Sequence, residues 1–297
     1  MEKILDFIDK SSSIYVRNLQ ALLKKPSVPV DIKGIEETAA VVKELLLGIS
    51  HNVEVIQPKR GSAPILYTRI SGETDKTILF YNYYDVLPPG PLSEWDYQPF
   101  DATIDAGKIY ARGAADNKGD LMARVKAVEA FIKMREAPPL TVKFIVEGEA
   151  KIGSPTLLRI APCRLEIFRA DACFYSAGSR DDEGRLELTL RDRPHLAGGD
   201  LESEIAGIVS EVVNEFYQRN PVVLFGSDNV SPVVQIISQL DIPLVGLSIA
   251  NNDSREASSN ENINTADFVD GIKLIAVIMQ RLSACGQGSA RCHSEEE

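Results

Sequence analysis

Short apolar segments alternate with amphipathic segments along most of the chain, and this alternation constrains the fold more than any other feature. Apolar residues at helical spacing predict helices, whereas short apolar runs between polar turns predict buried strands. The predicted helices lie at 4–23, 38–47, 120–134, 203–217, 233–240 and 265–281. The predicted strands lie at 53–56, 63–70, 76–81, 140–146, 172–175, 185–190, 222–225 and 243–249. This alternation favours an α/β fold, a three-layer sandwich in which helices cover both faces of a mixed, mostly parallel sheet.

The chain divides into one long patterned part and a short tail. Residues 1–285 carry the alternating pattern and are expected to form a single domain. Residues 286–297 are rich in glycine and serine and end in three glutamates. A segment of this composition cannot bury enough apolar surface to fold, so we expect a disordered tail.

Several classes of protein are disfavoured by composition. No uncharged apolar run reaches the ~20 residues that cross a bilayer, and the first residues lack the basic-then-apolar layout of a signal peptide. The 4 cysteines form no Cys-x-x-Cys pair, which fits a reducing compartment. With 32 basic and 43 acidic residues the net charge is −11, whereas nucleic-acid binding relies on clustered Lys and Arg. We therefore expect a cytoplasmic protein that binds no nucleic acid.

An ordered series of motifs follows the first helices. The motifs are ILFYNYYDVLP at 78–88, EWDYQPF at 94–100, GKIYARGAADNKGD at 107–120, VEGEAKIGS at 146–154 and SNENI at 259–263. In this order they resemble the zinc-dependent aminoacylase, carboxypeptidase and dipeptidase family, which includes acetylornithine deacetylase, succinyl-diaminopimelate desuccinylase and carnosine dipeptidases. Such a series is more specific than a single short motif. The resemblance implies the fold of a zinc-exopeptidase catalytic domain.

The family resemblance also locates a metal site that this chain has altered. In the family, two zinc ions share a water that a glutamate deprotonates for attack on an amide. The positions that correspond to metal ligands are Tyr83, Asp116, Lys151, Ser176 and Ala257, and the position of the base is Ala150. Only Asp116 keeps the family's residue type. A neutral phenol is a poor zinc ligand, a protonated lysine has no lone pair to give, and alanine cannot accept a proton.

Other residues near these positions carry further expectations. Asp85 corresponds to the carboxylate that orients a histidine ligand in the family. Asn117, Lys118 and His195 are candidates to line the old pocket. Loss of two cations would leave Asp116 as a costly buried anion, so we expect the Lys151 ammonium to pair with it. The alternative is that Lys151 points into solvent.

A lid domain that the resemblance implies is missing. In the family it follows the strand that corresponds to residues 186–190, carries the dimer interface and supplies a histidine. Here residues 193–199 lead almost directly into the next predicted helix. We therefore expect no lid near 195–200 and no lid-mediated homodimer. His195 is either a remnant of the lid histidine or a surface histidine.

These losses predict a catalytically inactive relative, a pseudoenzyme without a zinc cofactor. Such a protein would act as a structural or interaction subunit with an unidentified protein partner in a larger complex. The alternative is a hydrolase of N-acyl amino acids or dipeptides with residual or altered activity. In that case the residues around the old pocket, Tyr83, Asp85, Asp116, Lys118 and Lys151, would be candidates for acid–base work.

Overall fold

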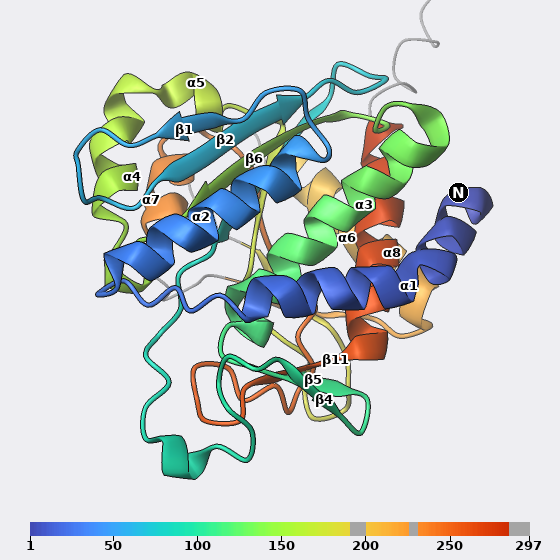
Figure 1. Ribbon diagram of the computed structural model, residues 1–297. Helices are drawn as coiled ribbons and strands as arrows, with labels where there is room; N and C mark the ends of the chain where they lie inside the picture. The colour runs from blue at the N-terminus through green and yellow to red at the C-terminus, as the bar shows by residue number, and fades with distance from the viewer. Residues whose placement is uncertain (191–199, 226–230, 285–297) are drawn as a thin grey trace, which may run out of the picture.

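The computed structural model describes residues 1–190, 200–225 and 231–284, and it confirms the α/β sandwich (Figure 1). The α-helices are α1 (Glu2–Leu23), α2 (Ile32–Leu47), α3 (Gly119–Arg135), α4 (Pro155–Ile160), α5 (Leu165–Phe168), α6 (Asp200–Tyr217), α7 (Pro232–Ser238) and α8 (Thr265–Ser283). The strands of the main sheet are β1 (Glu54–Ile56), β2 (Ile65–Ile70), β3 (Thr77–Tyr83), β6 (Thr141–Glu147), β7 (Ala172–Tyr175), β8 (Glu187–Leu190), β9 (Val222–Phe225) and β10 (Leu244–Leu247). Among the described residues, no helix has the length and apolarity that a bilayer crossing requires.

The main sheet has four parallel strands at its centre, and an antiparallel pairing joins this group to the strands on each side. Its strand order is β1-β2-β6-β3-β7-β10-β8-β9. Strands β6, β3, β7 and β10 run parallel to one another, whereas β2 is antiparallel to β6 and β8 is antiparallel to β10. The carboxyl ends of the central strands therefore meet at one edge of the sheet, which is where open α/β sheets bind ligands.

Two hydrophobic clusters cover the two faces of this sheet. Alternate residues of β3 contribute to the two clusters in turn. Phe80 packs with the cluster that includes α1, α3 and α8, whereas Leu79 and Tyr81 pack with the cluster that includes α4, α5 and α7. Figure 1 shows α1, α3 and α8 on one side and α4, α5 and α7 on the other. The alternation of side chains along a strand produces this division.

Several short elements were not predicted from the sequence. A second sheet has the order β11-β5-β4 and consists of β4 (Thr103–Asp105), β5 (Lys108–Tyr110) and β11 (Asn262–Asn264). In such short strands too few residues alternate for a two-residue pattern of apolar and polar side chains to be recognised in the sequence. Helix α2 begins at Ile32 rather than at residue 38, and Gly34 and Ile35 of its first turn are buried. The second sheet pairs the 107–120 and 259–263 motifs, which are distant in sequence.

A buried arginine on α3 ties the helix to the carboxyl ends of the central strands. Arg124 is 2 % exposed. Its Nη1 donates to the carbonyl oxygen of Tyr81 at 2.8 Å, and its Nη2 donates to that of Leu247 at 3.0 Å. These carbonyls lie near the ends of β3 and β10, so one side chain fixes the spacing of helix and sheet.

Replacing this arginine should destabilise the fold. Arg124→Met removes the donors but keeps much of the apolar stem, so buried carbonyl oxygens lose their partners. We expect the free energy of unfolding to fall by about 3 kcal/mol or more, measured by urea denaturation. Lys133→Met, at an exposed position of the same helix, should change it by less than about 0.5 kcal/mol. Equal effects of the two substitutions would contradict this account.

Candidate functional site

A cavity of about 430 Å³ opens at the carboxyl ends of the central strands. Tyr83 ends β3, Ser176 directly follows β7, and Ala150 and Lys151 belong to a short 3-10 helix, η3 (Ala150–Ile152), after β6. All four line the cavity. They converge because parallel strands end at the same edge of the sheet. The structure thus brings together most of the positions that the sequence singled out.

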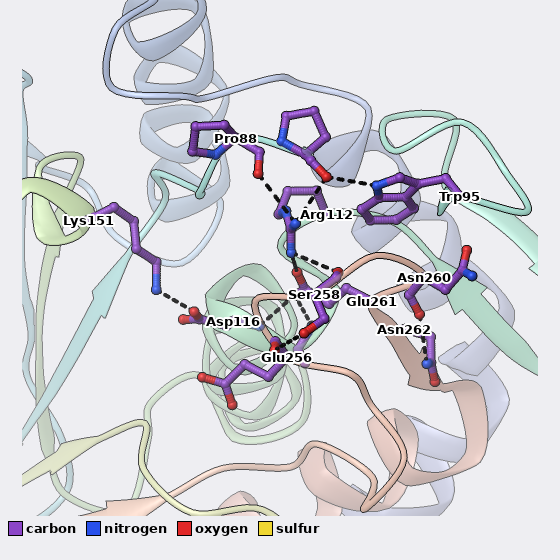
Figure 2. Close-up of polar contacts among 12 residues, drawn as sticks. Pro88, Trp95, Arg112, Asp116, Lys151, Glu256, Ser258, Asn260, Glu261 and Asn262 are labelled. Atoms are coloured by element: carbon purple, nitrogen blue, oxygen red, sulfur yellow. Dashed lines mark hydrogen bonds and ion pairs between the residues drawn. The ribbon is translucent and has the colours of Figure 1, made fainter. Parts of the chain in front are cut away.

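Asp116 is the centre of a compact charged group beside this cavity. Its side chain is 7 % exposed. The Tyr83 hydroxyl donates to Oδ1 and the Lys151 ammonium donates to Oδ2. The ammonium also lies 4.7 Å from the centroid of the Tyr83 ring. Figure 2 shows Lys151 reaching toward Asp116. The expected ion pair is therefore confirmed, and Lys151 does not point into solvent.

Tyr83 remains a neutral hydrogen-bond donor in this group. Burial raises its pKa well above the usual value, and the neighbouring Asp116 carboxylate raises it further. A phenolate next to a carboxylate would be unfavourable for both reasons. Both oxygens of Asp116 are thus occupied, one by a neutral hydroxyl and one by a cation.

A buried ion pair holds the backbone around Asp116. The Arg112 guanidinium and the Glu261 carboxylate are 2.8 Å apart, with 3 % and 1 % of their side chains exposed. Glu261 Oε1 also accepts the backbone N–H groups of Ala115 at 3.0 Å and Asp116 at 3.1 Å. Figure 2 shows Arg112 and Glu261 joined to each other between Trp95 and Asp116. The 107–120 and 259–263 motifs therefore meet to position Asp116.

Asp85 supports the turn that carries Lys151. It is fully buried, and its carboxylate accepts the backbone N–H groups of Ala150 at 3.2 Å and Lys151 at 2.8 Å. Burial raises its pKa to about 6, although these hydrogen bonds oppose the rise. In this chain the Asp85 carboxylate therefore orients the backbone of Ala150 and Lys151.

Asn117 and Lys118 lie beneath the cavity, which corrects the expectation that they line it. Both are fully buried. The Asn117 amide donates to the Ser176 hydroxyl, and its oxygen accepts from the backbone of Tyr83 at 3.2 Å. Lys118 points away and donates to the carbonyl oxygen of Lys25 at 2.6 Å. Burial lowers the Lys118 pKa to about 7. Burial of this kind cannot be read from the motif alone.

Glu256 belongs to the site, although sequence analysis did not identify it. It lines the cavity together with Tyr83 and Lys151. Among the residues that the structure describes, none forms a hydrogen bond or ion pair with its carboxylate. Glu256 is itself exposed, but partial desolvation by the surrounding protein raises its pKa to about 7, and the nearby Asp116 contributes. The segment around Glu256 forms neither a helix nor a strand, so no apolar pattern in the sequence pointed to this residue. Ala257, the next residue, is exposed.

The donor set of this site does not fit a pair of zinc ions. At the expected ligand positions lie a phenol, an ammonium, a hydroxyl and a methyl group beside the single carboxylate of Asp116. Zinc requires deprotonated donors, normally thiolate, imidazole or carboxylate. Within residues 1–190, 200–225 and 231–284, no group of three or more His, Cys, Asp or Glu residues could hold a metal ion. His195 lies outside the described residues.

Comparison with known proteins agrees with the motifs. The model of peptidase family M20/M25/M40 matches residues 79–281. Succinyl-diaminopimelate desuccinylase of Nitrosomonas eutropha is 28% identical over 208 residues, which cover 68% of this chain and 52% of that protein. Beta-Ala-His dipeptidase of Mus musculus is 30% identical over 172 residues, which cover 53% of this chain and 35% of that protein. The chain thus spans about half the length, or less, of the curated relatives it matches.

Solved structures share the fold at lower sequence identity. An M20 family metallo-carboxypeptidase from Sulfolobus solfataricus has a TM-score of 0.78 at 20% identity, with 91% of this chain and 99% of that chain covered. Human carnosine dipeptidase 1 has a TM-score of 0.78 at 16% identity, with 95% and 99% covered. At such identities the likeness demonstrates the fold alone. The family model, however, spans most of the sequence, and the chain therefore belongs to peptidase family M20/M25/M40.

Proposed function

We propose that this chain is a non-catalytic member of its family, a pseudoenzyme in which an internal cation occupies the place of the metal site. The observation that carries the proposal is the Lys151 ammonium on Asp116, the one retained ligand position. A fixed ammonium there would repel an incoming dication. It would also supply part of the positive charge that Asp116 otherwise lacks.

Two carboxylates near the cavity, those of Asp85 and Glu147, are poorly placed to act as a replacement base. Asp85 is committed to the backbone of Ala150 and Lys151. Glu147, at the end of β6, is fully buried and accepts hydrogen bonds from the hydroxyls of Tyr81 and Ser154. Burial raises the pKa of Glu147 to about 8. A general base must reach the proton it abstracts, and neither carboxylate is open to the cavity.

We infer that the retained fold serves as an interaction subunit, with an unidentified protein partner in a larger complex. Only residues 191–199 separate β8 from α6, which leaves no room for an inserted lid domain of the size the family uses. Assembly through a lid-mediated homodimer is therefore not expected. The proposed role as an interaction subunit requires the fold and does not require catalysis.

Removal of the internal cation should destabilise the protein. Lys151→Ala leaves Asp116 buried without its cation, and breaking a buried pair from one side typically costs ~3–5 kcal/mol. We expect a fall of that order in the free energy of unfolding, measured by chemical denaturation. Lys59→Ala, at an exposed position, serves as the control. The double variant Lys151→Ala/Asp116→Asn should recover part of the loss. An unchanged unfolding curve for Lys151→Ala would eliminate the internal-cation account.

The metal content should be low and amide hydrolysis absent. Protein purified without chelator and soaked in zinc should retain less than about a tenth of an equivalent after desalting, because the donor set does not suit the metal. The same sample should release no product from N-acetyl amino acids or from the dipeptide β-Ala-His. Mass spectrometry and an amine-release assay measure the two quantities. Two bound equivalents with zinc-dependent turnover would instead establish the hydrolase alternative.

A further inference from the structure

We propose that the surface formed by α4, α5 and the adjoining β1–β2 hairpin binds an acidic segment of a partner protein. The inference deepens the proposed function, on which it rests, because an interaction subunit requires a surface that recognises its partner. It gives that surface a place in the fold. It also gives the partner segment a chemistry, which is glutamate or aspartate side chains interspersed with apolar ones.

Three contacts join the hairpin and the two short helices into one surface. The Arg164 guanidinium, at the start of α5, donates to the Glu54 carboxylate of β1 at 2.8 and 2.9 Å. Nearer the turn of the hairpin, the backbone N–H of Ala63 donates to Glu149 Oε1 at 3.0 Å. The backbone N–H of Thr156 in α4 donates to Oε2 of the same carboxylate at 2.9 Å. Figure 1 shows α4 and α5 beside β1, so these elements present a common face.

Basic side chains predominate on this face, although the whole chain has a net charge of −11. The carboxylates of Glu54 and Glu166 both bind Arg164. Asp171, which follows α5, accepts the backbone N–H of Thr77 at 2.7 Å. Within the described part of the chain, no hydrogen bond or ion pair engages the side chains of four further basic residues, all exposed, which are Lys59, Arg60, Arg159 and Arg169. The face therefore offers cations that are available to an acidic partner.

Exposed leucines lie next to these arginines. Leu158 precedes Arg159 in α4 and is 42 % exposed, and Leu165 follows Arg164 in α5 and is 38 % exposed. A purely acidic partner would leave these leucines in water, whereas a purely apolar partner would leave the arginines without counter-ions. A segment that combines carboxylates with apolar side chains matches both features of the face.

The chemistry of the basic groups favours a protein over a membrane. A guanidinium can bind a carboxylate through two N–H groups, as Arg164 does with Glu54. Helices α4 and α5 have 6 and 4 residues, which is too short for the extended apolar stripe of a helix that lies in a bilayer surface. The net charge of −11 would also repel an anionic bilayer.

A labelled peptide tests this surface on the full chain. The probe is a synthetic peptide of repeated Glu-Glu-Leu units, and its counterparts carry lysine in place of every glutamate or serine in place of every leucine. Fluorescence anisotropy measures the affinity. We expect saturable binding of the acidic probe that weakens as salt is added, and no binding of the lysine counterpart. The serine counterpart should bind about fivefold more weakly or worse, because it has no apolar side chains to bury.

Matched charge reversals locate the binding surface. Arg159→Glu/Arg169→Glu should weaken binding of the acidic probe by about tenfold or more, because like charges would then face each other. Arg17→Glu/Lys133→Glu makes the same change of net charge at exposed positions of α1 and α3. This control should keep the affinity within about twofold of that of the unsubstituted protein.

Matched leucine substitutions test the apolar part of the surface. Leu158→Ser/Leu165→Ser should weaken binding of the acidic probe by about fivefold. Leu92→Ser, at a leucine that is 56 % exposed outside this face, should leave the affinity unchanged.

Several results would overturn the proposal. They are an absence of saturable binding of the acidic probe, equal binding of the lysine counterpart, and equal losses in the two pairs of charge reversals. Binding to phosphatidylserine vesicles without binding of the probe would assign the face to a membrane instead. Self-association that Arg159→Glu/Arg169→Glu abolishes, without binding of the probe, would assign it to a second copy of the chain.

The metal content and the hydrolysis assay of the same preparation separate this test from that of the proposed function. A zinc-free, inactive protein that does not bind the acidic probe would refute the docking surface alone. A protein with stoichiometric zinc and zinc-dependent hydrolysis would refute the pseudoenzyme, whatever the anisotropy shows.

Discussion

The buried pair of Arg112 and Glu261 is the interaction on which the site depends. Glu261 accepts two consecutive backbone N–H groups of the segment that carries Asp116. Arg112 also donates to the carbonyl oxygen of Ser258 at 3.1 Å and lies 5.3 Å from the centroid of the Trp95 ring. A buried ion pair is in itself weak evidence of stability. Its importance here is positional, since it connects segments far apart in sequence (Figure 2).

Carboxylates around a former metal site must be stabilised by something other than the metal. This chain stabilises its carboxylates in three different ways. Asp116 accepts from a lysine and a tyrosine. Asp85 accepts backbone N–H groups. Glu147 has its pKa raised to about 8 by burial, so at neutral pH its uncharged form is favoured. Pairing, hydrogen bonding and neutralisation are the routes by which a protein can bury an acidic group.

Sequence reasoning recovered the central strands and long helices because their apolar patterns are strong. It could not supply the strand order or the short strands of the second sheet, since pairing between distant segments leaves no local pattern. In the site the family resemblance located Tyr83, Lys151 and Ser176, and the structure brings them together because they lie at or after strands that end at one edge. Sequence reasoning missed Glu256, which lies in an irregular loop, and it placed Lys118 in the cavity wall although that side chain points toward α1.

The fold persists without the family's ligands because the contacts that shape the site are made to backbone atoms. Arg124 donates to strand carbonyls, Asp120 accepts the backbone N–H of Ile249 at 2.9 Å, and Glu261 holds the amides beside Asp116. Among these contacts only the one to Asp116 involves a ligand position of the zinc site, and it is made to the backbone N–H rather than to the side chain. Substitutions at Tyr83 or Lys151 positions could therefore accumulate while the cavity kept its walls. A cavity preserved in this way still presents the side chains that line it, Lys151 and Glu256 among them, to a molecule that enters.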